Sequence, residues 1–317
     1  MLSYGFRRVL GVIPVVFLTS VIVFGLMHLL PGDPVQLLVG QAQAEVSAAT
    51  IAALRHQYML DQPIWLQYVA WARHVLVGDF GRSLQTHQPV WEVIRPRILP
   101  TVQIGLTAWI MAVLVAVPVG AITARHPGSL GDWVGTVTTL AGAAMPYFLI
   151  GGVLIYVVAL RLGWLPPSGY VPLDQGLGAS IRSTIMPAIT LSLSLGAVIA
   201  RQARASFAEV LRFPYIRSAR AKGLSEIQVM THHVFKNAML PVVTILGVQL
   251  ATMFSGAVVT ETVFAIPGIG RLLVDSILGR DYPVVQAVVL FLTVIVVMAN
   301  LLVDILYGLL DPRIRRA

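Results

Sequence analysis

Long apolar runs dominate the chain and recur at intervals that predict membrane-spanning helices. The first run, residues 9–30, has 22 residues and one titratable side chain, His28. At about 1.5 Å of rise per residue it reaches about 33 Å as a helix, which is enough to cross the hydrocarbon core of a bilayer. Five further runs occupy residues 101–123, 134–160, 184–200, 238–260 and 284–310. The pattern predicts an all-α polytopic membrane protein with six transmembrane helices and both termini on the same side.

Prolines interrupt five of the six runs: Pro14, Pro118, Pro146, Pro187 and Pro241. Each proline lacks a backbone donor, so a helix in lipid tolerates it only where neighbouring helices satisfy the freed carbonyl group. The prolines are consistent with kinked helices that bend around a central space. They are equally consistent with the general abundance of proline in membrane helices, and both explanations stay open.

The composition agrees with a membrane protein and excludes several classes of enzyme. Apolar residues make up 57% of the chain, charged residues make up 11%, and the mean hydropathy is +0.81. A soluble domain has about 45–50% apolar and about 25% charged residues, so an ordinary soluble enzyme is excluded. The chain has no cysteine, which excludes disulfide bonds, thiol nucleophiles and cysteine-ligated clusters.

Basic residues are concentrated on one side of the predicted topology. Residues 1–8, 124–133, 201–237 and 311–317 carry 13 of the 22 Lys and Arg residues, although they are the shorter share of the loops. Cytoplasmic loops carry such an excess, so we expect both termini to lie in the cytoplasm. The excess of basic residues on the side that faces membrane lipid accounts for the formal net charge of +8. A nucleic-acid partner is not needed to explain it.

We expect three parts along the chain. Residues 1–30 form a cytoplasmic N-terminus and an uncleaved first transmembrane helix, residues 31–100 form an extracytoplasmic domain, and residues 101–317 form a five-helix core. Residues 50–58 of the outer segment look helical, and the segment is expected to form a small folded cap at the membrane surface. Four aromatic residues lie in it: Trp65, Tyr68, Trp71 and Trp91.

Motifs for catalysis are missing from the chain. It has no G-x-x-x-x-G-K-[ST] phosphate-binding loop, no G-x-S-x-G and no H-E-x-x-H, so we expect no ATP hydrolysis by this chain and no cofactor bound to it. His232 and His233 would point about 100° apart on a helix, which is poor geometry for one metal ion, and no metal site is expected. Asp304 lies at membrane depth in the last run, where it should face another helix or water, and of the two we expect a structural pairing.

The cytoplasmic loop 201–237 predicts two helices joined by a turn. Ala and Arg favour the first helix, and Gly223 can end it in a left-handed conformation. Ser225 and Gln228 have the spacing of a capping box that starts the second helix. The apolar residues of that helix follow helical spacing and form a stripe: Ile227, Met230 and Val234. The stripe either packs on the protein's own helix ends or docks a soluble partner.

This loop resembles that of the permease subunits of binding-protein-dependent ABC importers. Their inner-face signature is Glu-Ala-Ala, three residues and then Gly, and the chain aligns with it at Arg217, Ser218, Ala219 and Gly223, without the acidic residue and one alanine. The run from Ala219 to Leu224 and the later Asn237-Ala238 are similar to the dipeptide, oligopeptide and nickel branch. Further segments resemble the same branch: Leu30-Pro31-Gly32-Asp33-Pro34, Gly78-Asp79-Phe80-Gly81-Arg82-Ser83, Glu261-Thr262-Val263-Phe264, Pro267-Gly268-Ile269-Gly270, Arg280-Asp281-Tyr282-Pro283-Val284-Val285-Gln286 and Asp311-Pro312-Arg313.

The resemblance implies a type I ABC importer permease fold in the bacterial cytoplasmic (inner) membrane, with an extracytoplasmic domain after the first helix. It also implies a second homologous permease, two cytoplasmic ABC ATPases that bind ATP and Mg, and an extracytoplasmic solute-binding protein. The solute would be a dipeptide or oligopeptide, with nickel, glutathione or another small solute as alternatives. An integral membrane enzyme is an alternative from another class, but it would need paired polar groups in facing spans, and Asp304, His28 and the scattered Ser and Thr residues form no such group. A structural membrane scaffold fits the composition but does not account for the ordered segments.

The resemblance also implies candidate site residues at both faces of the membrane. At the inner face, the loop would couple the ATPases to the permease through Arg217, Ser218, Ala219, Lys222, Gly223, Ile227 and Met230. At the outer face, several charged residues would order the outer loops or meet the receptor: Asp79, Arg82, Glu261, Arg280 and Asp281. No catalytic residue is expected in either set.

Overall fold

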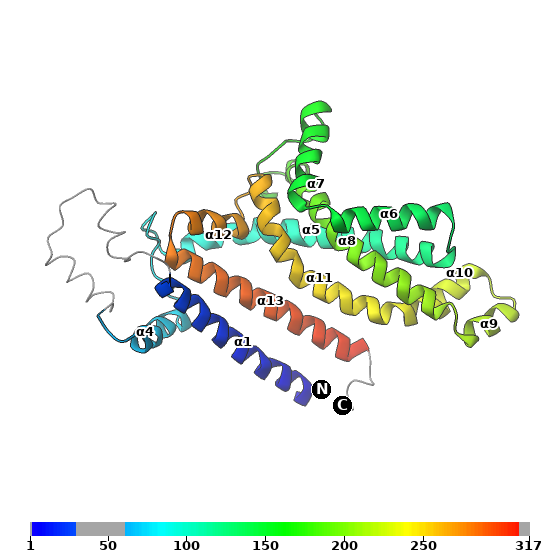
Figure 1. Ribbon diagram of the computed structural model, residues 1–317, viewed down its shortest axis with the longest axis horizontal. Helices are drawn as coiled ribbons and strands as arrows, with labels where there is room; N and C mark the ends of the chain where they lie inside the picture. Colours follow the sequence, from blue (N-terminus) through cyan, green and yellow to red (C-terminus); the bar gives the residue numbers. More distant parts are fainter. Residues whose placement is uncertain (1, 30–60, 311–317) are drawn as a thin grey trace. The chain divides into compact units, whose positions relative to one another are not determined.

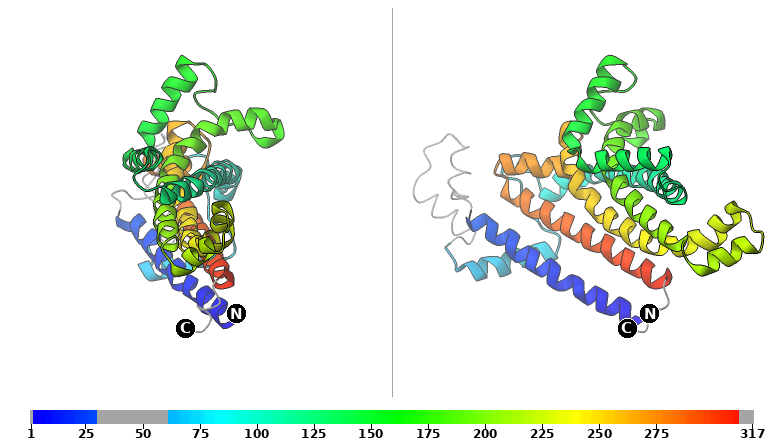
Figure 2. Two further views of the ribbon diagram at one scale, coloured as in Figure 1. Left: turned by 90° about the vertical axis from the view of Figure 1, so that its right-hand side faces the viewer. Right: turned by 45° about the vertical axis from the view of Figure 1, so that its right-hand side comes forward.

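The structure is a computed structural model that describes the backbone of residues 2–29 and 61–310 and the side chains of residues 10–25 and 61–303. This part of the chain is built from helices, drawn in Figures 1 and 2. In chain order they are α1 (Leu2–Leu29), α4 (Ile64–Leu76), α5 (Val90–Arg125), α6 (Leu130–Ala144), α7 (Tyr147–Leu154), η1 (Ile155–Arg161), η2 (Leu173–Gln175), α8 (Leu177–Val210), α9 (Pro214–Ala221), α10 (Glu226–Gln228), η3 (Val229–Val234), α11 (Phe235–Val263), α12 (Ile269–Leu278) and α13 (Tyr282–Leu310). Helices η1 and η3 are π-helical, and η2 is a 3₁₀ turn.

Four of the described helical segments are long and apolar enough to cross a membrane: Val90–Arg125, Leu177–Val210, Glu226–Val263 and Tyr282–Val303. A fifth candidate is the bent pair of helices Leu130–Ala144 and Tyr147–Arg161. A shorter apolar helix, Leu10–Gly25, lies within α1, where the sequence predicts the first span. The described residues therefore hold four or five candidate spans in an all-helical membrane protein.

The apolar run 134–160 is not the single helix that its hydropathy predicts. Helix α6 ends at Ala144, Met145 is extended, and α7 begins after Pro146, so the two helical segments meet at an angle of 108°. The residue before a proline disfavours helical backbone and the proline donates no hydrogen bond, which explains the break. The other four prolines lie within the bounds of continuous helices: Pro14 in α1, Pro118 in α5, Pro187 in α8 and Pro241 in α11.

The chain divides into two compact units, of which the first comprises residues 1–9, 97–272 and 295–317. At its centre is α8, which makes its most extensive contacts with α11 and α6. Small residues let these backbones approach closely. A Cβ added to Gly120 of α5 would lie 2.8 Å from the α8 backbone, and one added to Gly142 of α6 would lie 2.9 Å from the carbonyl oxygen of Leu193.

The second unit comprises residues 10–96 and 273–294. Helix α4 packs on α1 through aromatic side chains, because the ring of Phe24 lies 5.5 Å from the rings of both Tyr68 and Trp71. The hydroxyl groups of Tyr68 and Ser20 are 2.8 Å apart. The aromatic residues that the sequence places in the outer segment therefore pack partly against the first helix.

Several expectations fall outside the described residues. They are the helix at residues 50–58, the segments Leu30-Pro31-Gly32-Asp33-Pro34 and Asp311-Pro312-Arg313, and the side chain of Asp304. These stay predictions from the sequence.

Candidate functional site

The loop between α8 and α11 forms the expected helix–turn–helix. Helix α9 begins with Pro214 at its first position, where the missing N–H does no harm. Gly223 follows α9 with a φ of +79°, the left-handed conformation expected of it. Ser225 and Gln228 form the predicted capping box, in which the Ser225 N–H donates to Gln228 Oε1 over 3.0 Å. Figures 1 and 2 show α9 and α10 together beyond the ends of α8 and α11.

Helix α9 divides the predicted coupling residues between two faces. Ile216 and Ala219, three residues apart, are buried against the rest of the unit, whereas Arg217, Ser218 and Lys222 are exposed. Ala219 is only 6% exposed, so it packs inward instead of facing a partner, as its small size allows. Four of the seven predicted coupling residues, the three named above and Gly223, are exposed around this helix and turn.

The apolar stripe of the second helix is not the single face that was predicted. Ile227 is 73% exposed, Met230 is half-buried, and Val234 is fully buried. Val229, five residues before Val234, is also fully buried, and residues 229–234 form a π-helix with hydrogen bonds between residues five apart. Each alternative for the stripe therefore applies to part of it. Val229 and Val234 pack on the protein itself, and Ile227 lies at the surface, where a partner could contact it.

Glu226 connects the two helices of the loop to the end of α5. Its carboxylate accepts a hydrogen bond from Arg220 Nε over 2.8 Å and lies 4.0 Å from Arg125 Nε. All three side chains are between 37% and 42% exposed, so each pair contributes at most about 1 kcal/mol. The contacts orient the turn more than they stabilise the fold.

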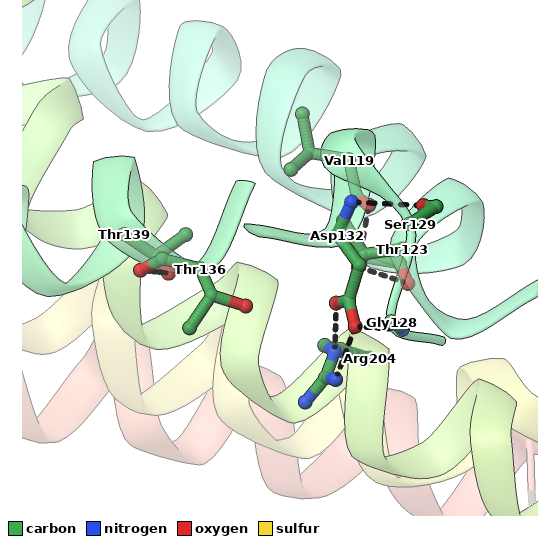
Figure 3. Close-up of polar contacts among 9 residues, drawn as sticks. Val119, Thr123, Gly128, Ser129, Asp132, Thr136, Thr139 and Arg204 are labelled. Carbon is green, nitrogen blue, oxygen red and sulfur yellow. Dashed lines mark hydrogen bonds and ion pairs between the residues drawn. The ribbon is translucent and has the colours of Figure 1, made fainter. Parts of the chain in front are cut away.

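An ion pair that the sequence analysis missed lies next to this loop. Arg204 of α8 donates from Nε and Nη2 to the two carboxylate oxygens of Asp132 in the first turn of α6, over 2.8 and 2.9 Å. Ser129 caps α6 and Gly128 N–H donates to Asp132 over 3.0 Å, as Figure 3 shows. The serine followed by an acidic residue three positions later was a readable signal for the cap, but nothing in the sequence pairs Asp132 with Arg204.

Glu261, a predicted outer-face residue, is fully buried at the end of α11. Its carboxylate accepts hydrogen bonds from Thr101 Oγ1 over 2.6 Å and from Arg271 N–H over 2.9 Å, in the first turn of α12. Thr101 Oγ1 in turn accepts the Ile269 N–H over 2.8 Å. A carboxylate is favourable at a helix N-terminus, and a Cβ added to Gly268 would overlap the Glu261 carboxyl group. The segments 261–264 and 267–270 are therefore one structural cluster.

Asp281 is also buried, in the second unit, where it joins two signature segments. Its carboxylate accepts hydrogen bonds from Ser83 Oγ and, over 3.0 Å, from the Leu84 N–H. Ser83 Oγ also accepts the Thr86 N–H over 3.0 Å. The turn around residues 78–89 is thus held to the start of α13.

Removing the Ser83 hydroxyl tests this link. We expect Ser83→Ala to lower the free energy of unfolding by about 1–3 kcal/mol, because the buried Asp281 carboxylate loses a donor. Thermal unfolding of the purified chain measures the change. Ser168→Ala, which removes the hydroxyl of an exposed serine, is the matched control, and equal stability of the two variants would contradict the prediction.

The remaining outer candidates lie at the surface. Asp79 Oδ1 accepts the Gly81 N–H over 2.9 Å, and its other oxygen is 3.4 Å from His74 Nδ1. Arg82 donates to the His87 carbonyl group over 3.1 Å. Arg280 is exposed in a left-handed conformation with a φ of 56°. These three side chains are available to a partner, unlike those of Asp281 and Glu261.

A further polar contact, at the predicted outer face, involves the loop before α8. Burial raises the pKa of Tyr170 above its ordinary value, with a smaller contribution from the charge of Asp174. The phenol therefore stays protonated and donates to Gln103 Oε1 over 2.7 Å. Gln103 donates in turn to Ser180 Oγ over 2.9 Å.

In the part of the chain that the structure describes, no group of three His, Cys, Asp or Glu residues could hold a metal ion.

Two family descriptions match nearly the whole chain. The description "Binding-protein-dependent transport system inner membrane component" matches residues 116–316, and that of the corresponding N-terminal region matches residues 1–105. Among curated relatives, the glutathione transport system permease protein GsiC of Salmonella choleraesuis (strain SC-B67) is 42% identical over 99% of both chains. The probable peptide ABC transporter permease protein y4tP of Sinorhizobium fredii (strain NBRC 101917 / NGR234) is 40% identical over 98% of this chain and 99% of that protein.

Solved structures agree on the fold. An inward-facing structure of the MetNI methionine ABC transporter has a TM-score of 0.58 at 15% identity, covering 69% of this chain and 96% of that one. A crystal structure of an amino acid ABC transporter with histidines gives a TM-score of 0.53 at 14% identity, covering 68% and 94% of the two chains. The chain belongs to the family of binding-protein-dependent transport system inner membrane components and is a multi-pass, non-catalytic permease subunit of an ABC importer.

Proposed function

We propose that this chain and a second homologous permease form the pathway of an ATP-driven importer for dipeptides or oligopeptides. The observation that carries the proposal is the 40% identity, over 98% of the chain, to a probable peptide permease. Glutathione, itself a tripeptide, is a second candidate, favoured by the 42% identity to permeases named for glutathione transport. Nickel is the other solute that the resemblance implies.

Family membership implies partners that perform the chemistry and the recognition. Two cytoplasmic ABC ATPases would bind ATP and Mg, and an extracytoplasmic solute-binding protein would deliver the solute. We propose that the ATPases contact exposed residues of α9, the following turn and α10: Arg217, Ser218, Lys222 and Ile227. When ATP closes the ATPases, α9 and α10 would move with them and tilt α8 and α11, so that the cavity opens to one side of the membrane at a time.

At the other face, the exposed side chains of Asp79, Arg82 and Arg280 are proposed to meet the solute-binding protein. Glu261 and Asp281 would act indirectly, because both are buried and hold outer segments in place.

The topology proposed with this function has six spans, cytoplasmic termini, an extracytoplasmic domain at residues 31–100 and a five-helix core at residues 101–317. Reporter fusions or cysteine labelling test it, since the chain has no native cysteine. A cysteine at Ser129 or Ser218 should react only with reagents that reach the cytoplasm, and one at Ser168 only with reagents added outside. Outside labelling of Ser218 would contradict the topology.

The solute is tested with the whole transporter. The permease is co-expressed with the second permease, the ATPases and the binding protein, and the complex is reconstituted in vesicles that contain ATP. We expect uptake of labelled dialanine or trialanine, with glutathione and nickel as competing solutes, and no uptake with an ATPase that cannot hydrolyse ATP. Uptake of nickel without any peptide or glutathione would overturn the proposed solute class.

A further inference from the structure

A pair of adjoining cavities lies between α5, α6 and α8 in the first unit. One has a volume of 560 Å³ and reaches the loop between α5 and α6, and the other has a volume of 470 Å³ and extends along the helices. The same residues line part of both cavities, so the two adjoin: Val119, Thr123, Gly135, Thr139 and Ala200. We refer to the two adjoining cavities together as the groove, which extends from the ends of the helices into the apolar part of the bundle.

The two ends of this groove differ in character. Its loop end is lined by four arginines, Arg125, Arg201, Arg204 and Arg212, and Asp132, which pairs with Arg204, lies beside it. The side chains of Arg201 and Arg212 are exposed and make no ion pair or hydrogen bond with the described residues. The loop end of the groove is therefore positively charged, with two arginine side chains free to bind an anion.

The other end is apolar and open at its rim. Val115, Ile122 and Val134 line it, and each is more than 60% exposed, although they lie on helices long and apolar enough to span the membrane or on the adjoining α6. In a membrane these rim residues contact acyl chains. The groove thus offers a cationic end at the level where spanning helices finish and an apolar channel directed toward the middle of the bilayer.

We propose that this groove binds one anionic phospholipid, with its phosphate at Arg201 and Arg212 and one acyl chain in the apolar channel. Charge complementarity selects an anionic headgroup, because basic pockets between membrane helices attract such lipids. The bound lipid would fill the space between α6 and α8 beside the Asp132–Arg204 ion pair, and so stiffen the part of the bundle nearest the coupling loop. The inference does not depend on which solute is transported.

Photolabelling of the assembled transporter tests the site. The complex of both permeases and the ATPases is placed in phosphatidylcholine nanodiscs that contain a few per cent of phosphatidylglycerol with a photoreactive group on its acyl chain. We expect labelling of peptides from residues 111–140 and 189–200. A photoreactive phosphatidylcholine should label them on the order of 25-fold less, since each of the two arginines contributes on the order of a fivefold gain in affinity for anionic lipid.

Variants separate the headgroup contact from the acyl contact. Arg201→Gln and Arg212→Gln should each lower phosphatidylglycerol labelling about fivefold. Thr139→Phe should lower it without changing any charge, because the larger side chain fills the joint between the cavities, and the hydroxyl that it removes bonds only to the Thr136 carbonyl group. Lys236→Gln changes an exposed basic residue of α11 that lines neither cavity, and it should leave the labelling unchanged.

Three outcomes would overturn the proposal. Equal labelling by the two lipids would show a groove without headgroup selectivity, and this comparison uses the unaltered chain, so it does not depend on any variant that fails to fold. Labelling of the isolated chain that disappears in the assembled complex would identify the groove as a subunit interface. Loss of labelling in millimolar inorganic phosphate would indicate a site for a soluble anion.

Discussion

Replacing Gly223 with valine is expected to abolish ATP-driven uptake while the permease still inserts into the membrane. The backbone of Gly223 has a φ of +79°, and apart from its two neighbours in the chain no described residue has an atom within 4 Å of where a Cβ would be. The effect therefore comes from the backbone alone: a residue with a side chain loses about 1–2 kcal/mol in this conformation, and a β-branched residue loses more. Relief of that strain would change the angle between α9 and α10, which we propose carry the movement of the ATPases.

A graded series at Gly223 separates strain from bulk. Asparagine tolerates left-handed backbone, so Gly223→Asn should keep most of the uptake, Gly223→Ala should fall between, and Gly223→Val should have the least. Uptake by reconstituted vesicles and co-purification of the ATPases are measured for each variant. If asparagine and valine have equal effects, the conformation of this turn does not govern coupling.

Substitutions at Ile227 complete the same test by changing a contact instead of the backbone. Ile227 is 73% exposed, so Ile227→Asp should leave the permease folded but weaken its association with the ATPases. Met230→Asp should act in the same direction, with some loss of stability because Met230 is half-buried. Val234→Asp is the contrasting control, since Val234 is fully buried and a charge there should destabilise the chain itself. Normal assembly and uptake by Ile227→Asp would mean that this surface contacts no partner.

The inner loop shows what sequence patterns can and cannot predict. Its turn at Gly223 and the capping box of Ser225 and Gln228 depend on residues within a few positions of one another, and both were predicted correctly. The prediction of a single apolar face on the second helix was wrong, because residues 229–234 form a π-helix, whereas the spacing used for the prediction is that of an α-helix. That Val229 and Val234, five residues apart, are both buried follows from the sequence only if the π-helix is already known.

Contacts between side chains far apart in the chain could not be predicted from the sequence for a different reason. Ser83 and Asp281 are 198 positions apart, and Asp132 and Arg204 are 72 apart, so no local spacing connects them. Resemblance to a family identified the segments that contain Asp281 and Glu261, but it did not distinguish a buried structural carboxylate from one that meets a receptor. Burial and donor geometry make that distinction. Hydropathy likewise predicted an apolar segment at residues 134–160 correctly, but not its break at Pro146.

Removing the Glu261 carboxylate is expected to destabilise the permease more than any other single change at the outer candidates. In Glu261→Leu the Arg271 N–H loses its bond to the Glu261 carboxylate, and the Thr101 hydroxyl keeps only the Arg97 carbonyl group, 3.3 Å away. Each lost hydrogen bond to the buried carboxylate costs about 1–3 kcal/mol, so the free energy of unfolding should fall by about 2–6 kcal/mol. Glu261→Gln, which keeps one acceptor oxygen, should cost less.

Thermal unfolding and limited proteolysis of the purified complex measure this effect. Glu209→Leu makes the same substitution at an exposed position of α8 and is the matched control. Thr101→Val provides an independent variant, because Thr101 Oγ1 both donates to Glu261 and accepts the Ile269 N–H, so its loss should loosen the start of α12. If Glu261→Leu keeps full stability but binds the solute-binding protein less tightly, Glu261 acts in receptor contact, and the buried network is not what it contributes.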